Sequence, residues 1–94
     1  MSVTLVATMK IEDMETLTQY REKAGSALAK HGGSVIAAGP ISRTLEGTEL
    51  DADTAAILSF PDVVSADNWI SDPELQPIHA KRNKAGKSTI SMIG

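Results

Sequence analysis

The chain contains no cysteine, and its aromatic residues are one tryptophan, one tyrosine and one phenylalanine. Without cysteine there are neither disulfides nor thiolate metal ligands, so stability must come from packing and no oxidising compartment is required. The core must then be built from valine, isoleucine, leucine, methionine and alanine. Because the two histidines are far apart in the sequence, we expect no metal site. No glycine-rich phosphate loop follows an expected strand, and we expect no cofactor.

The chain also lacks an excess of positive charge and a long hydrophobic run. Its formal net charge is −3, so no basic field would hold a phosphate backbone and we expect no nucleic-acid partner. The N-terminal stretch SVTLVATMK has neither a basic start nor a long apolar block, so we expect no signal peptide and no membrane span. A cytoplasmic location follows by default. A chain this short supports one core, and we expect a single domain over residues 1–94.

The first half of the chain predicts a strand, a helix and a second strand. Residues 3–9 alternate with the period of two that is typical of a strand. Asp13 suits the N-cap of an amphipathic helix, and Gly32 or Gly33 can take the left-handed conformation that ends it. Residues 34–46 are rich in β-branched side chains and contain Gly-Pro, which predicts a long second strand with a bend or bulge in its middle.

The second half predicts two more strands and further helix. Residues 47–53 form a polar hairpin loop, and residues 54–60 return as the third strand, antiparallel to the second. Asp62 is the expected N-cap of a short second helix. The Asp-Pro pair that follows predicts another helical segment over residues 73–84. Residues 87–94 alternate weakly and close the fold as the fourth strand.

This order of elements is the ferredoxin-like βαββαβ arrangement, an α+β fold with one four-stranded antiparallel sheet and helices on one face. The other face is expected to carry no charge, which is unusual for a surface exposed to water. We therefore expect a homodimer in which two sheets pack face to face as a dimeric α+β barrel. The residues expected on this bare face are Thr4, Val6, Thr8, Ile36, Ala38, Ala55, Ile57, Ser59, Thr89, Ser91 and Ile93.

Several short motifs together resemble one protein family. They are HGG at residues 31–33, LEG at 45–47, SFP at 59–61, Trp69, and DPELQPIHAKR at 72–82. On these landmarks, and over nearly its full length, the chain resembles the domain of unknown function (DUF) 1330 family, small proteins of the dimeric α+β barrel superfamily. The resemblance implies a ferredoxin-like subunit that dimerises through its sheet, and no established activity. Superfamily relatives include cofactor-free monooxygenases, muconolactone isomerases and haem-dependent enzymes, a link by fold analogy alone.

Three residues are candidate catalytic groups. His79 shares a helical face with Leu75 and Arg82, and an imidazole suits acid–base chemistry near neutral pH. Arg82 could hold a carboxylate or an enolate. Glu46 ends the expected second strand, where it could face a pocket between sheet and helices as a base. The alternatives are structural: His79 is a packed residue, and Glu46 lies in water or pairs with Arg43 or Arg82.

Three further residues are candidates for contact with a ligand. Tyr20 and Trp69 could line the pocket of a flat aromatic molecule, or they could simply be core. His31 is also a candidate, although the dipole of the first helix explains a cation at that helix's last turn. The basic run at residues 81–87 could meet a phosphate group, but the end of a helix favours positive charge in any case.

Two functions of different class are compatible with these observations. The first is a cofactor-independent enzyme that acts by proton transfer or oxygenation on a small hydrophobic metabolite. The second is a non-catalytic homodimer that binds a small molecule or only itself. An open cavity between sheet and helices into which His79 or Glu46 projects would favour the enzyme, whereas a solidly packed space would favour a structural role.

Overall fold

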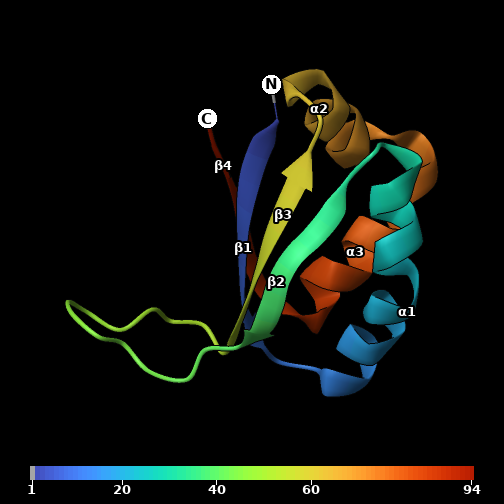
Figure 1. Cartoon of the computed structure of the whole chain (residues 1–94). Coiled ribbons are helices and arrows are strands. Elements are labelled where there is room, and N and C mark those ends of the chain that lie inside the picture. The colour runs from blue at the N-terminus through green and yellow to red at the C-terminus, as the bar shows by residue number, and fades with distance from the viewer. Residues whose placement is uncertain (1) are drawn as a thin grey trace.

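The computed structural model describes residues 2–94 and has the expected ferredoxin-like α+β architecture (Figure 1). The sheet has the strand order β2-β3-β1-β4, and all neighbouring strands are antiparallel. The helices cover one face of the sheet and leave the other face open. The elements are β1 (Val3–Ile11), α1 (Met14–Lys30), β2 (Ser34–Pro40), β3 (Thr54–Phe60), α2 (Val63–Ser71), the 3₁₀ helix η1 (Pro73–Leu75), α3 (Gln76–Ala85) and β4 (Gly86–Ile93).

Helix α1 begins and ends as its sequence predicts. The Asp13 carboxylate accepts hydrogen bonds from the backbone N–H and the hydroxyl of Thr16. After Lys30 the chain turns at Gly32, whose φ of 74° is readily adopted only by glycine. Gly33 lies against the ring of Phe60, where a Cβ atom would come within 2.6 Å of the ring. The two glycines therefore have different tasks, since one makes the turn and the other allows close packing.

The second strand is shorter than predicted. We expected a strand over residues 34–46, but β2 ends at Pro40 and residues 41–53 form a long loop, which we call the arm. Proline has no N–H to donate to a neighbouring strand, and the Ile41 N–H donates to the Asp53 carbonyl oxygen, which closes the base of the arm. Beyond that bond the chain leaves the sheet, so Glu46 lies in the arm and not at a strand end.

The outer face of the sheet differs from the prediction at two places. A bulge between Val35 and Ala37 shifts the register, so Ala38 pairs with Ala56 on the helix side, and Ile36 is the extra residue. The other nine predicted residues share the outer face by register. Lys10 and Lys87 are paired on the same face, so it is charged at one end and uncharged elsewhere.

The remaining boundaries follow the sequence closely. Asp62 caps α2 by accepting a hydrogen bond from the Ser65 N–H. The helical segment expected over residues 73–84 is divided into η1 and α3, because Pro77 has no N–H to continue a helix from η1. Within residues 2–94, no helix has both the length and the apolar character needed to cross a membrane.

The hydrophobic core lies at one end of the space between sheet and helices. Phe60 is completely buried there and its ring centre is 5.4 Å from that of Trp69. The other buried members of this cluster are Val3, Leu5, Ala27, Leu28, Leu58, Ala66 and Leu75. A smaller cluster of Met9, Leu17 and Ala85 lies toward the other end. The two clusters are separate, and the space between them contains the candidate site.

Candidate functional site

A row of alanines crosses the sheet on the side that faces the helices. Ala38 of β2 pairs with Ala56 of β3, which pairs with Ala7 of β1. The three methyl groups do not fill the space between the sheet and the helices, whereas larger side chains at these positions would contact the helices. The result is a cavity of about 680 Å³ between the sheet and α1. Residues from all four strands, α1 and α3 line it, and most of their side chains are apolar.

The cavity is open along the edge of the sheet. Every residue of β2 is exposed, because α1 lies over the central strands and leaves the edge strand uncovered. Val35, Ala38 and Pro40 form that side of the cavity, while Leu17 and Tyr20 of α1 form the opposite side. The cavity is therefore exposed to solvent between α1 and β2.

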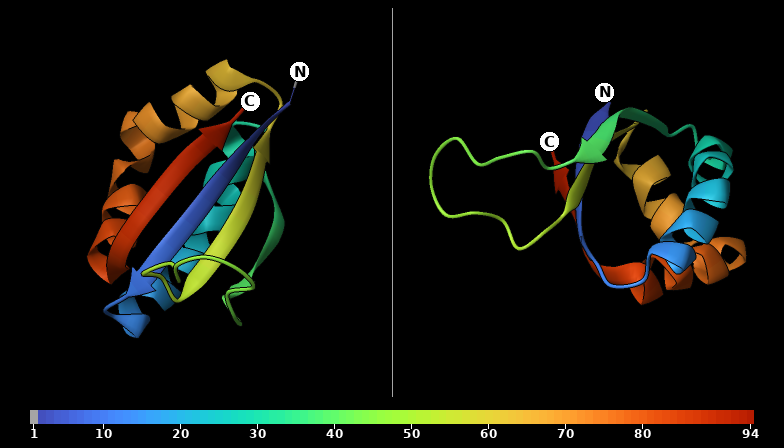
Figure 2. Two further views of the ribbon diagram at one scale, coloured as in Figure 1. Left: turned by 90° about the vertical axis from the view of Figure 1, so that its left-hand side faces the viewer. Right: turned by 90° about the horizontal axis from the view of Figure 1, so that it is seen from below.

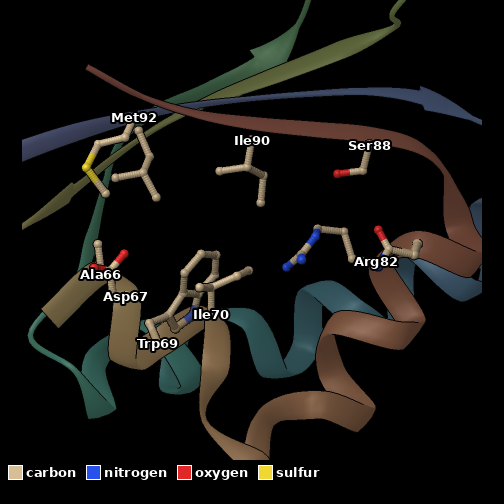
Figure 3. A pocket seen from close by; sticks show the side chains of 10 residues that line it. Ala66, Asp67, Trp69, Ile70, Arg82, Ser88, Ile90 and Met92 are labelled. Atoms are coloured by element: carbon tan, nitrogen blue, oxygen red, sulfur yellow. The ribbon is translucent and has the colours of Figure 1, made fainter. Parts of the chain in front are cut away.

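Arg82 of α3 lies at the inner end of this cavity. Its residue is only 6% exposed, and its guanidinium carbon lies 5.7 Å from the centre of the Tyr20 ring and 5.6 Å from that of Trp69. It also lines a second cavity of about 250 Å³ beside Trp69 and β4 (Figure 3). In that view Arg82 extends from α3 into the space below Ser88 and Ile90. The guanidinium group thus lies between two cavities and two aromatic rings.

No carboxylate pairs with Arg82 in the part of the chain that the structure describes. Its Nε atom is buried and has no hydrogen-bond partner among the residues that the structure describes. A buried cation without a counter-charge is costly, and the two aromatic faces offset this cost only in part. The geometry therefore favours an anionic group in the adjacent cavity, held by charge-assisted hydrogen bonds.

His79 supports Arg82 from the preceding turn of α3. Its Nε2 atom lies 3.0 Å from the Trp69 carbonyl oxygen, which can only accept, so Nε2 carries the proton and donates. Nδ1 is then free to accept a hydrogen bond from the Arg82 guanidinium at 2.8 Å. Burial lowers the pKa of His79, which keeps the ring neutral and suits both bonds. Both ring nitrogens are engaged, and the residue is 4% exposed.

The two aromatic candidates lie on either side of Arg82. Tyr20 is half-buried and lines the larger cavity. Trp69 lines the smaller cavity and is also part of the core, with its ring edge-on to His79 at 4.9 Å between centres. The indole N–H of Trp69 has no hydrogen-bond partner within residues 2–94 and faces the helices in Figure 3, away from the cavity. Tyr20, Trp69, His79 and Arg82 therefore form one cluster.

The structure does not bring the other two candidates to this cluster. Glu46 is exposed in the arm, and it forms no ion pair with Arg43 or Arg82 within residues 2–94. His31 lies at the end of α1, where its Nε2 atom is 2.8 Å from the Asp72 carboxylate. His31 therefore helps to fasten α1 to the turn before η1.

Asp72 is the centre of that second polar cluster. Its carboxylate lies 2.7 Å from the Lys30 ammonium group, and it also accepts the Glu74 backbone N–H. The hydrogen bond from Lys30, followed by that from His31, holds the pKa of Asp72 well below its usual range. Within residues 2–94, no three histidine, aspartate or glutamate side chains gather in a way that could hold a metal ion.

The comparisons with known proteins agree with this fold and leave the site open. The model of a family described as "Domain of unknown function (DUF1330)" matches residues 2–94. A protein of unknown function from Rhodopseudomonas palustris, RPA0582, is 18% identical with a TM-score of 0.80, over 98% of this chain and 80% of that one. No curated protein matches the sequence.

Two further solved structures resemble this one. A dimeric ferredoxin-like protein of unknown function from Jannaschia sp. CCS1 is 12% identical with a TM-score of 0.79, and the match covers 100% of this chain and 99% of that one. SnoaB, a cofactor-independent oxygenase from Streptomyces nogalater, is 12% identical with a TM-score of 0.73, over 99% of this chain and 91% of that one. At these identities the similarity shows the fold alone.

Proposed function

Because this chain belongs to the DUF1330 family, whose description assigns no function, we propose a function from the geometry of its own residues. The protein binds a small, flat, apolar molecule that carries one acidic oxygen group, such as a carboxylate or an enolate. The ligand lies in the cavity between the sheet and α1, with its acidic group on Arg82. The observation that carries this proposal is the buried guanidinium group, which has no carboxylate partner among residues 2–94.

The cavity suits the apolar part of such a ligand. Its volume of about 680 Å³ is within the range of small-molecule sites, roughly 300–1,000 Å³. Met9, Leu17 and Ile90 supply apolar contact, and the ring of Tyr20 lies where it can contact a flat ligand near Arg82. Binding of an anion beside Arg82 would replace the missing counter-charge, so the polar end of the ligand would supply specificity.

Catalysis on an acidic C–H group is the second candidate, and Arg82 is again the reason to consider it. A buried cation stabilises the enolate that forms when a carbonyl compound loses a proton to solvent, and thus lowers the pKa of the ligand's C–H group. His79 would act as a positioning residue for Arg82, since both of its nitrogens are already bonded. SnoaB, a protein of this fold, is described as a cofactor-independent oxygenase.

The open face of the sheet supports a homodimer. Apart from Lys10 and Lys87 at one end, the residues on it are small, hydroxylic or aliphatic, which is a poor surface to leave in water. A second copy placed on it by a two-fold axis would bury the same face of both chains. The Jannaschia protein of similar fold is described as dimeric.

The binding proposal is tested with two dyes that share an aromatic frame. 8-Anilinonaphthalene-1-sulfonate is an anion, and N-phenyl-1-naphthylamine is its neutral counterpart. We expect Arg82→Met to weaken binding of the anionic dye by about tenfold or more, since hydrogen bonds to charged groups contribute about 1.5–3 kcal/mol. Lys84→Met, which removes an exposed cation from the same helix, is the matched control and should bind as the wild type does.

Two outcomes of this titration decide the binding proposal. Selective loss of the anionic dye in Arg82→Met supports the proposal, while the neutral dye should bind almost equally to all three proteins. Equal binding of the anionic dye to the wild type and Arg82→Met would show that Arg82 does not anchor the ligand. For catalysis, benzoylacetone serves as the probe. The wild type, but not Arg82→Met, should form its enolate at a lower pH than buffer alone, as followed by ultraviolet absorbance, and should consume oxygen. Enolate formation without oxygen uptake would support stabilisation of the anion by Arg82 and would exclude oxygenation of this probe.

A further inference from the structure

The arm, residues 41–53, extends from the sheet on the side away from the helices. Figure 1 shows it as the green and yellow loop that projects beyond the strands, and the right-hand view of Figure 2 shows the helices on the opposite side. Residues 42–50 make no hydrogen bond with any other part of residues 2–94. The arm therefore projects from the same side as the open face and is not folded onto its own chain.

The base of the arm is firmly attached to the sheet. The Asp53 N–H donates to the Met9 carbonyl oxygen at 2.8 Å, and the Asp53 carboxylate accepts the Ile11 N–H at 2.8 Å. Lys10 also forms an ion pair with Asp51 at 3.0 Å. These contacts hold the C-terminal end of the arm, at Asp51 and Asp53, against β1. The bond from the Ile41 N–H to the Asp53 carbonyl oxygen joins the N-terminal end to it, so the base of the arm is fixed within its own chain.

Two leucines in the arm are left in water. Leu45 is 84% exposed and Leu50 is 63% exposed, and they lie on the two halves of the loop. Burial of a leucine side chain is worth about 1.5–3 kcal/mol, so two exposed leucines on one projecting loop indicate a missing contact surface. The open face alongside them is also uncovered, and by register its charged residues are Lys10 and Lys87 at one end.

We propose that the arm is a clasp for a second copy of this chain. The inference rests on the homodimer proposed above and goes beyond it, because it assigns part of the interface to a segment outside the sheet. When two open faces pack together, each arm projects past its own sheet toward the other subunit. Leu45 and Leu50 are then buried against the outer surface of the partner, and the two-fold axis makes both clasps equivalent.

The area of the interface supports this occupant. Strands rise about 3.3 Å per residue and lie about 4.8 Å apart, so a face of four strands of this length measures roughly 25 by 19 Å. That plane covers roughly 500 Å² as a projected area, whereas a typical stable interface buries ~800 Å² of solvent-accessible surface per partner. A pair of arms adds apolar surface on the same side and brings the interface toward that size.

The experiment is sedimentation velocity on the full chain across a range of concentrations. Leu45→Asp/Leu50→Asp removes the proposed contacts, and Thr44→Asp/Thr48→Asp is the matched control with the same added charge on the same arm. We expect the leucine variant to raise the dissociation constant of the dimer by about tenfold or more, because buried apolar contacts dominate interface energy. The threonine variant should change it by less than about threefold, since exposed charges contribute little.

Trypsin gives a second readout, because the bond after Arg43 lies in the arm. A clasped arm should be cut slowly at high protein concentration and faster on dilution, whereas the leucine variant should be cut fast throughout. Val6→Lys places a charge in the middle of the open face and therefore tests whether the dimer forms through that face. If the wild type and the leucine variant dimerise equally, the clasp is wrong and the sheet dimer stands. If the wild type is a monomer at micromolar concentration, both are wrong and ligand binding is unaffected.

Discussion

The two ends of the space between sheet and helices differ although the same strands and helices bound both. At one end Phe60, Trp69 and Leu58 meet the helices in a closed core, in which Phe60 is fully buried. Toward the other end Ala7, Ala38 and Ala56 occupy the equivalent helix-facing positions, and a cavity of about 680 Å³ remains. The two ends lie only one or two helix-facing residue pairs apart along the same strands. The size of the side chains at these pairs therefore decides whether the space is a packed core or a cavity.

This difference shows where the protein can accommodate function. The packed end has closely packed rings and supplies stability. The cavity at the other end therefore does not need to contribute to it. Arg82 lies at the boundary, held by His79 from its own helix and flanked by Trp69 on the packed side and Tyr20 on the hollow side. The buried charge is costly, and it is tolerated there because the adjacent core holds His79 and Trp69 in position around it.

Phe60→Ala should have the largest effect, because it turns the packed end into a second hollow. Loss of a fully buried phenylalanine costs about 3–5 kcal/mol in the free energy of unfolding. Urea denaturation followed by circular dichroism measures this change. Val64→Ala on the exposed side of α2 is the control, and it should alter stability by less than about 0.5 kcal/mol. Similar midpoints for the two variants would contradict the assignment of stability to the packed end.

Ala56→Leu should change ligand affinity more than stability, because the added side chain fills the cavity. The added side chain enters the middle of the alanine row, so stability should change by less than about 1.5 kcal/mol. Affinity for 8-anilinonaphthalene-1-sulfonate should fall by roughly tenfold or more, equivalent to about 1.4 kcal/mol. Ala29→Leu on the exposed side of α1 adds the same atoms outside the cavity. Full dye affinity in Ala56→Leu would place the ligand elsewhere.

Asp72→Asn should have the smallest effect, and one that depends on pH. The folded protein holds the pKa of Asp72 below its usual value of 3.8, so the carboxylate stabilises the fold above that pH. This contribution is lost as the pH falls from about 3.8 toward the lower folded-state pKa. The wild type should therefore be more stable than Asp72→Asn at neutral pH, and the difference should shrink in acid.

Urea midpoints at neutral and acid pH measure the Asp72 effect, with Glu74→Gln as the control. Glu74 also pairs with Lys30, but its side chain is 82% exposed and should matter little. A stability difference between the wild type and Asp72→Asn that stays constant with pH would contradict the role assigned to this carboxylate. Such a result would mean that the ion pairs of Asp72 with the end of α1 do not affect the nearby packed core, which includes Leu75.

Much of the fold could be predicted because its signals are local. Asp13 and Asp62 accept the hydrogen bonds expected of N-caps, Gly32 takes a positive φ, and strand alternation identifies the buried side of β1 and β3. The prediction for β2 was wrong at its end, because β-branched residues after Pro40 suggested a strand that has no neighbour to pair with. A partner strand is a property of the sheet and not of the segment.

The site could be predicted only in part. His79 and Arg82 were placed on one buried helical face by their spacing, but the hydrogen bonds that turn His79 toward a supporting role depend on the Trp69 carbonyl of another helix. A pocket between sheet and helices was considered from the sequence, but the alanines that form it were not identified. Ala7, Ala38 and Ala56 lie on three different strands, and Ala38 belongs to the row only once the bulge in β2 is known.

The sequence by itself determined the order of the elements, the N-caps of the first two helices and the apolar side of β1 and β3, because hydrogen bonds and side-chain periodicity act over a few residues. Only the tertiary structure decided that three alanines from three strands lie in one row, that Arg82 has no carboxylate beside it among residues 2–94, and that Glu46 lies on an arm outside the sheet. These features depend on register and on which distant segments meet, and no local pattern records that information.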